Sequence, residues 1–282
     1  MNTVRRDPHL FGHARHRWTL AMIAEVFDWL QGRAAGVVWG VLNRLGIHYK
    51  RARDYLHSPD PHYQAKRALI AEHRARAERE PARFPLLYLD ELSYYRQPEL
   101  AWAYEAAGHS QPLARRSYAS NTCFRLVAAL DALTGQVIYT QRSHITTACL
   151  SDFFGQIRAA YPQAETIAIV LDNWPVHFHP DVLCRLRPQH FPWPPHLPAN
   201  WPTEPQRKAI RDTLPIQLLC LPTYASWLNP IEKLWRWLKQ DVIRLHRCAD
   251  DWPRLKSLVA AFLDRFLTGS LDLLRYVGLL PY

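Results

Sequence analysis

The spacing of apolar residues changes at Phe84, and this change separates two kinds of secondary structure. Before Phe84, apolar side chains recur every three or four positions, as they do along one face of a helix. After it, short apolar runs between turn residues predict strands over 86–90, 121–130, 136–142, 167–172 and 216–221, with a helix over 147–161. An antiparallel hairpin followed by strands that alternate with helices predicts an α/β fold, in which helices flank a mixed sheet.

Three regions follow from this division. Residues 1–58 are expected to form a small all-α region, residues 59–82 a charged and solvated helical linker, and residues 83–282 the α/β domain. Of the 22 prolines, 11 lie in residues 175–222. Because proline removes a backbone donor from helices and sheets, an irregular insertion is expected at about 175–215.

The N-terminal region has the pattern of a helix-turn-helix. One helix is predicted from Leu20 to Leu30 with Thr19 as its N-cap, and a second over residues 37–45. In a DNA-binding interpretation the second helix enters the major groove, and the basic segment 47–53 forms a strand or wing that meets phosphates. The alternative is a plain helical hairpin that packs on the main domain.

The charge distribution favours nucleic acid as a partner. The net charge is +10, and residues 1–82 hold 14 Lys+Arg against 8 Asp+Glu, so this smaller part of the chain carries +6 of the excess. A basic region of this kind is typical of proteins that bind polyanions. The residues expected to contact DNA are Arg33, Arg44, Lys50, Arg51 and Arg53.

Membrane and secretory signals are not found in the sequence. There is no run of 18 apolar residues, and the first 20 residues contain no apolar core of a signal peptide. The five cysteines are odd in number and far apart, as in a chain with reduced thiols. We therefore expect no membrane contact and a cytoplasmic, nucleoid-associated location.

Three carboxylates occupy similar places in the predicted framework. Asp90 and Asp172 end two predicted strands, and Glu232 lies in the first turn of the helix that follows the last strand. That helix is expected to start with Asn229 as N-cap and Pro230 at its first position, so that Glu232 completes a capping box. Each residue alone has a structural explanation, but all three can converge at one edge of the sheet.

Clustered carboxylates repel one another unless a cation or a proton compensates them. Oxygen ligands without cysteine favour a hard ion, so we expect Mg²⁺ or Mn²⁺ at Asp90, Asp172 and Glu232. Two such ions about 4 Å apart can stabilise both the attacking and the leaving oxygen of a phosphodiester. The sequence therefore predicts a site with two ions for phosphodiester chemistry.

The segments YLDELSYY, IVLDNWPVH and LPTYASWLNPIEKLW, in this order, resemble the catalytic segments of DDE transposases of the mariner superfamily, in its bacterial insertion-sequence branch. The resemblance covers most of residues 18–275. It implies a ribonuclease H-like core, and metal-dependent cleavage and strand transfer of double-stranded DNA at the element's terminal repeats and the target. It also implies a homodimer assembled on two ends, with Asp90, Asp172 and Glu232 as the catalytic, metal-binding triad.

Further residues match the family's pattern. Asn173 and His177 fit its DN-x-x-x-H motif, and Asn229 is the asparagine before the catalytic Glu, so all three are expected to contact the triad or DNA. The segment 96–112 resembles the hairpin that follows the first Asp in relatives. Two features depart from the family: the spacing from Asp172 to Glu232 is longer, and one helix-turn-helix is found where members usually carry two.

Three other interpretations remain open at this point. A DNA-binding protein derived from a transposase could lack catalysis, and a ribonuclease H-like nuclease could cut DNA without joining it. Zinc chemistry could use His177 and His179 with His190 or His196, although this segment offers no cysteine and no clear third ligand.

Overall fold

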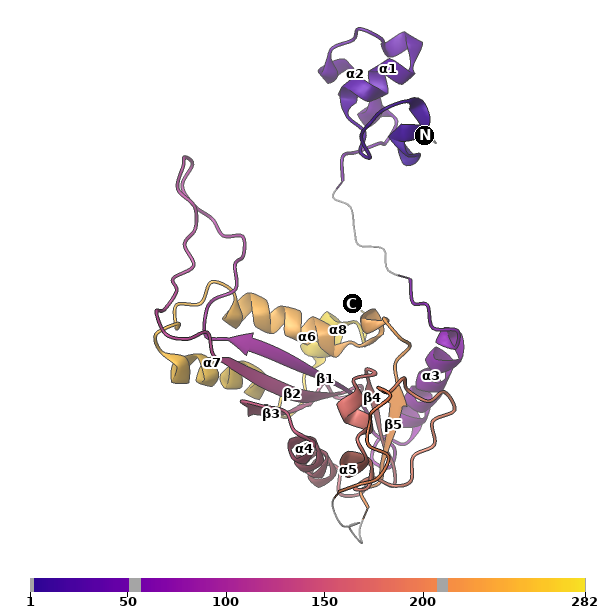
Figure 1. Cartoon of the computed structure of the whole chain (residues 1–282), viewed down its shortest axis with the longest axis vertical. Coiled ribbons are helices and arrows are strands. Elements are labelled where there is room, and N and C mark those ends of the chain that lie inside the picture. Colours follow the sequence, from indigo (N-terminus) through magenta and orange to yellow (C-terminus); the bar gives the residue numbers. More distant parts are fainter. Residues whose placement is uncertain (1–2, 51–56, 207–212, 282) are drawn as a thin grey trace. The chain divides into compact units, whose positions relative to one another are not determined.

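The computed structural model describes residues 3–50, 57–206 and 213–281, and the chain divides into two compact units, Met1–Tyr55 and Leu56–Tyr282 (Figure 1). The described part of the first unit is helical, and the second unit contains the sheet.

The first unit is built on helices α1 (Leu20–Val26) and α2 (Ala35–Arg44), with short 3-10 turns at Thr3–Arg5, Pro8–Phe11 and Asp28–Leu30. Thr19 caps α1 as predicted, because its Oγ1 accepts a hydrogen bond from the Met22 amide at 3.2 Å. The first helix is shorter than predicted, since the chain leaves the α-helix after Val26. A small core joins the two helices through Ile23, Ala24, Leu30 and Val38.

The second unit contains a five-stranded mixed sheet in the order β3-β2-β1-β4-β5. Antiparallel pairs join β1 to β2 and β2 to β3, whereas β4 runs parallel to both β1 and β5. All five strands were predicted from the sequence, and their bounds are β1 (Leu86–Tyr95), β2 (Cys123–Asp131), β3 (Val137–Arg142), β4 (Ile167–Leu171) and β5 (Ile216–Cys220).

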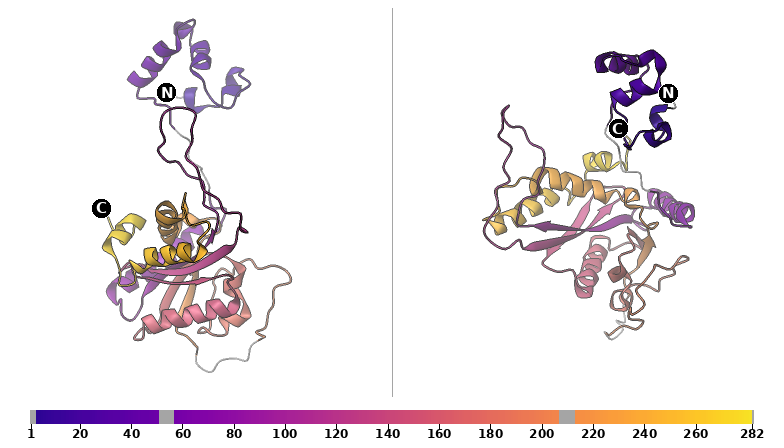
Figure 2. Two further views of the ribbon diagram at one scale, coloured as in Figure 1. Left: turned by 90° about the vertical axis from the view of Figure 1, so that its left-hand side faces the viewer. Right: turned by 45° about the horizontal axis from the view of Figure 1, so that its top comes forward.

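Helices cover both faces of this sheet (Figure 2). One face packs against α4 (Thr147–Ala160) and α5 (Pro180–Leu183) through Leu87 and Leu89 of β1. The other packs against helices α6 (Ile231–Leu238), α7 (Trp252–Asp264) and α8 (Leu271–Val277). Because successive strand residues point to opposite faces, Leu86, Tyr88, Leu92 and Tyr94 of β1 belong to this second core.

Helix α3 (Tyr63–Arg79) is not the solvated linker that its charged residues suggested. It belongs to the second unit, its Ala77 is fully buried, and Leu69 and Ile70 pack against the core. A narrow apolar stripe is enough to bind the helix to the domain, while its charged residues cover the other sides. The boundary therefore precedes this helix.

Strand β1 is twice as long as predicted, so Asp90 lies within the strand and not at its end. Its antiparallel register with β2 continues from Leu87 opposite Asp131 to Tyr95 opposite Cys123. Its parallel pairing with β4 covers only Leu86 to Tyr88. Asp90 thus sits two residues beyond the point where β4 leaves β1, which opens the sheet at its side chain.

Several other segments complete the second unit. The proline-rich stretch is irregular as predicted, apart from a 3-10 turn at Pro175–Phe178, α5 and a bridge between Leu186 and Leu214 in its described part. Residues 96–122 form a long projecting loop without strands, so the expected hairpin is absent from that segment (Figure 1). None of the described helices combines the length and the hydropathy needed to cross a bilayer.

Candidate active site

A cavity of about 620 Å³ collects the three predicted acids. Asp90 of β1, Asp172 after β4 and Glu232 of α6 all line it. The rest of its wall comes from residues 60–66 around the start of α3, from Trp193 to His196 in the proline-rich stretch, and from the loop between β5 and α6. The structure therefore brings the predicted triad to one cavity from three separate elements.

Asp90 is the most perturbed of the three acids. Burial, Glu232 and Glu91, in that order, raise its pKa to about 8, because each of them disfavours the charged carboxylate. One oxygen, Oδ2, accepts a hydrogen bond at 2.8 Å from the indole Nε1 of Trp235, a buried residue of α6. The indole fixes the carboxyl group without neutralising it, so a cation would relieve the charge that Asp90 carries when ionised.

Asp172 follows directly on β4 and is exposed to the cavity. Its Oδ1 accepts a hydrogen bond from the Trp174 amide at 3.0 Å, which closes a tight turn at the strand end. The side chain remains 53% exposed. Its second oxygen is thus available to a ligand while the first is held by the backbone.

Glu232 lies in the first turn of α6, as predicted; the residue as a whole is exposed, but its carboxyl group is partly shielded from solvent. Burial is the largest influence on its pKa and raises it, Asp172 raises it further, and Lys239 and Arg236 act in the opposite direction, with a net upward shift. Glu232 raises the pKa of Asp90, and Asp172 raises the pKa of Glu232, so the negative charges of the cavity act on one another.

The predicted capping of α6 is wrong in its details. Pro230 is the N-cap, and no side chain caps the helix. Asn229 instead turns its side chain toward the sheet, where Nδ2 donates to the Leu89 carbonyl at 3.1 Å. Glu232 is therefore not used in a capping box, which leaves its carboxylate free for the cavity.

Asn229 and Asn173 both connect the elements that carry the acids. The bond from Asn229 ties the start of α6 to the residue that precedes Asp90. Asn173 Nδ2 donates to the Leu221 carbonyl at 3.0 Å, so the residue after Asp172 holds the end of β5. Among the described residues, Asn229 Oδ1 is buried and has no hydrogen-bond partner.

Glu91 and His177 form a second cluster with Asp172. The fully buried His177 places Nε2 at 2.9 Å from Glu91 Oε1 and Nδ1 at 3.4 Å from Asp172 Oδ1. Burial alone would lower the pKa of His177, but Glu91 and Asp172 outweigh it and raise the pKa. Ligand atoms of Glu91, Asp172 and His177 lie within 4.8 Å of one another, so this group is a second candidate for holding a metal.

Glu91 was not among the predicted site residues, although it follows Asp90 directly in the segment YLDELSYY. As neighbours in one strand, the two side chains point to opposite faces of the sheet. Asp90 points to the side of α6, and Glu91 to the side of α4. Asp172 contacts the Glu91 cluster through His177 and influences the pKa of Glu232, so it belongs to both groups.

The alternative of a zinc site finds no support among the described residues. His177 is engaged with Glu91 and Asp172, and His179 Nδ1 accepts a hydrogen bond from the Asp181 amide. In the part of the chain that the structure describes, the candidate metal groups are the one with His177 and an exposed group of Asp7, His9 and His16.

The predicted DNA-contacting residues lie in the first unit. Arg33, Arg44 and Lys50 are exposed, and Arg51 and Arg53 lie outside the described residues. Residues 47–50 form no strand, so the described part of the expected wing is irregular.

The donor set of the cavity fits a hard divalent cation. Its acids offer oxygen ligands, no cysteine is among its described lining residues, and burial together with Glu232 and Glu91 raises the pKa of Asp90. Lys66 also lines the cavity, but its ammonium group already donates a hydrogen bond to the Asp60 carboxylate.

Comparison with known proteins agrees with this geometry. The profile of the family described as DDE superfamily endonuclease matches residues 85–256, more than half of the chain. The insertion element IS630 uncharacterized 39 kDa protein of Shigella sonnei is 25% identical over 257 residues, which make up 90% of this chain and 66% of that protein. The chain thus spans slightly less than two thirds of this relative.

Solved structures show the same fold. The Mos1 transposase paired-end complex with left transposon end aligns with a TM-score of 0.58 and 16% identity, over 97% of this chain and 74% of that chain. The Mos1 mariner paired end complex with Mn gives a TM-score of 0.58 and 15% identity, over 97% and 74%. The expected ribonuclease H-like, mixed α/β fold is therefore confirmed. Because the profile match covers more than half of the chain, these findings show that the chain belongs to the DDE superfamily endonuclease family.

Proposed function

We propose that this protein is an insertion-sequence transposase that binds the ends of its element, cuts DNA there and joins the ends to a target. The observation that carries the proposal is the meeting of Asp90, Asp172 and Glu232 on one cavity inside the domain that matches the family. Three acids from separate elements, with the pKa values of Asp90 and Glu232 raised, form a typical site for divalent metals.

In this proposal Asp90, Asp172 and Glu232 hold two Mg²⁺ or Mn²⁺ ions. When bound, such ions activate a water or a 3′-hydroxyl and stabilise the charge on the leaving oxygen. The chain's own residues prepare the site: Trp235 orients the Asp90 carboxyl, Asn229 ties α6 to β1, and His177 places Nδ1 at 3.4 Å from Asp172 Oδ1. The relatives Mos1 with Mn and Mos1 with Mg support the choice of metal.

The first unit supplies end recognition in this proposal. Its exposed Arg33, Arg44 and Lys50 suit contacts with phosphates of double-stranded DNA, and Arg51 and Arg53 follow in the same basic segment. The titles of the Mos1 structures describe paired ends, which supports a homodimer that joins two DNA ends.

The test uses purified protein and a plasmid that carries the DNA flanking its own gene, with Mg²⁺ or Mn²⁺. We expect breaks at the flanking repeats with the wild-type protein and none with Asp172→Ala. Asp272 on α8 provides the matched control, because its side chain is 87% exposed and lies outside the cavity. The Asp272→Ala variant should cut DNA at the wild-type rate. Binding to the repeats without breaks would instead support the non-catalytic DNA-binding alternative.

A further inference from the structure

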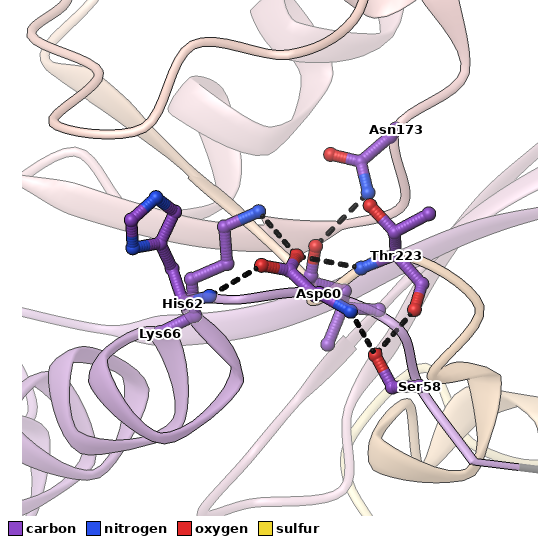
Figure 3. Close-up of polar contacts among 7 residues, drawn as sticks. Ser58, Asp60, His62, Lys66, Asn173 and Thr223 are labelled. Carbon is purple, nitrogen blue, oxygen red and sulfur yellow. Dashed lines mark hydrogen bonds and ion pairs between the residues drawn. The ribbon is translucent and has the colours of Figure 1, made fainter.

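A buried ion pair lies on the cavity wall apart from the three acids. Asp60 and Lys66 are only 9% and 7% exposed, and Lys66 Nζ lies 2.8 Å from Asp60 Oδ2 (Figure 3). Charged side chains are rarely this buried unless they are paired. Both precede the predicted catalytic domain in the sequence, and neither matches a motif discussed above.

Asp60 and the nearby Ser58 bind the backbone of Thr223 in a distant loop. Asp60 Oδ2 also accepts a hydrogen bond from the Thr223 amide at 2.9 Å, and the Thr223 carbonyl accepts one from Ser58 Oγ at 2.6 Å. Ser58 Oγ in turn accepts from the Asp60 amide at 3.3 Å, and Asp60 Oδ1 from the His62 amide at 2.8 Å. The backbone N–H and C=O of Thr223 are thus both bound by the segment 58–66, which we name the clasp (Figure 3).

The loop that the clasp holds leads directly to Glu232. It runs from the end of β5 at Cys220 to the start of α6 at Ile231. The next residue, Tyr224, has a backbone φ of 55°, in the left-handed region that residues other than glycine rarely adopt. Such a conformation persists only where surrounding contacts enforce it, and the clasp provides contacts at the adjacent peptide.

The same loop is also held from the other side. Asn173, next to Asp172, donates to the Leu221 carbonyl, two residues before Thr223 (Figure 3). The loop from β5 to Glu232 is therefore held at Leu221 by Asn173, the residue after Asp172, and at Thr223 by Asp60 of the buried ion pair. Residues of the clasp and of the loop line the cavity that contains the triad.

Stability alone does not explain this arrangement. A buried ion pair is often no more stabilising than apolar residues of similar volume, because both charges must leave water. What Asp60 adds is an acceptor at a defined position, and Lys66 keeps that acceptor ionised and in place.

We propose that Asp60, Lys66 and Ser58 are positioning residues, which fix the Thr223–Tyr224 loop and through it the place of Glu232 relative to Asp90 and Asp172. This inference rests on the proposed function, since it assigns the clasp to the assembly of the same metal site.

Two double variants of the full chain separate positioning from folding. Asp60→Asn with Lys66→Met removes both charges but keeps an acceptor oxygen for the Thr223 amide. Asp60→Leu with Lys66→Met removes both charges and the acceptor. For each variant we would measure the thermal midpoint Tm, the Mn²⁺ dissociation constant from the resonance signal of free Mn²⁺, and the Mn²⁺ concentration for half-maximal DNA cutting.

The Asn/Met variant is expected to bind Mn²⁺ within about threefold of the wild type, and the Leu/Met variant about tenfold or more weakly, at similar Tm values. Ser58→Ala, which deletes one hydrogen bond and no charge, is expected to weaken Mn²⁺ binding by about two- to threefold, and it tests the inference even where the Leu/Met chain does not fold. Wild-type Mn²⁺ affinity in Ser58→Ala and in a folded Leu/Met variant would overturn the inference. The proposed function fails separately, when the wild-type protein binds Mn²⁺ but makes no breaks.

Discussion

Among single residues, Asp90 shows most directly how the fold prepares a site for cations. Burial and the neighbouring Glu232 and Glu91 raise its pKa to about 8, so in the absence of metal its ionisation opposes folding. The sign follows from linkage: a carboxyl with a raised folded pKa destabilises the fold increasingly as pH rises above its unfolded value of 3.8.

Asp90→Asn should therefore stabilise the metal-free protein, by on the order of 2–4 kcal/mol at pH 8 after allowance for partial exposure. The gain should be smaller at pH 5, where the wild-type carboxyl is protonated at less cost. Calorimetry of both proteins in EDTA, from pH 5 to pH 8, measures this difference in stability. A stability difference that stayed constant with pH would contradict the predicted environment of Asp90.

Asp60 has the opposite behaviour. Burial alone would raise its pKa, but hydrogen bonds from Lys66 and from the Thr223 and His62 amides outweigh burial and lower it from 3.8 to about 2. Its contribution to stability is present above pH 3.8 and is lost as pH falls toward 2.

Between pH 4 and pH 2, the wild-type protein should lose about 2 kcal/mol more stability than the variant with Asp60→Asn and Lys66→Met, which has no carboxyl to protonate. Urea unfolding at several acidic pH values provides the measurement. Parallel losses in the two proteins would show that the ionised Asp60 is not needed by the fold.

At the scale of elements, α6 carries two groups that meet near β1. Glu232 lies in its first turn, and Trp235, one turn later, donates its indole hydrogen to Asp90. Trp235→Phe keeps most of the packing but removes this donor, so DNA cutting should fall about tenfold, with a stability loss of about 1 kcal/mol.

Trp237→Phe is the matched control on the same helix, because its indole donates to the exposed Asp241 and lies outside the cavity lining. It should cut DNA at close to the wild-type rate. Equal losses of cutting in both tryptophan variants would indicate a general effect on α6, and not a role for the bond to Asp90.

The elements themselves were largely predictable from the sequence, since strands β1 to β5 and α4 follow clear apolar periods. The helix α8 was missed, and the helix predicted from Pro230 changes to a π-helical turn at Lys239–Ile243. The full length of β1 depends on its pairing with β2 and not on its own residues, so a local pattern could not place Asp90 within the strand.

The same distinction holds for the site. Asp172 and Glu232 could be placed from local signals, a strand end and a helix start. Three contacts join residues more than 80 positions apart: the bond of the clasp to Thr223, the bond from Asn229 to Leu89, and the link between Glu91 and His177. Such contacts arise only when the sheet and helices are assembled, and no spacing in the sequence reveals them.

At the scale of the whole molecule, the chain contains two compact units with different predicted tasks. If the first unit binds DNA through phosphates, replacing Arg33, Arg44 and Lys50 by Ala should reduce the slope of log K against log salt by up to about 2.7, or 0.9 for each contact. A matched triple of exposed arginines in the second unit, Arg67, Arg79 and Arg275, should change it less. Fluorescence anisotropy with flanking DNA measures the salt dependence of binding for both triple variants. If the two variants have equal slopes, Arg33, Arg44 and Lys50 do not belong to the DNA interface.

If Asp90, Asp172 and Glu232 form the site that cuts DNA, variants in this group and in the neighbouring cluster should differ in their rates of cutting. Because Asp172 also belongs to the cluster with Glu91 and His177, variants at Glu232 and Glu91 discriminate between the two groups. We would measure the rate of Mn²⁺-dependent cutting of flanking DNA by Glu232→Gln and by Glu91→Gln, both with DNA binding verified. We expect a loss on the order of 1,000-fold or more for Glu232→Gln and a clearly smaller loss for Glu91→Gln. Cutting at the wild-type rate by Glu232→Gln, with loss in Glu91→Gln, would contradict this expectation and assign the chemistry to the other face of the sheet.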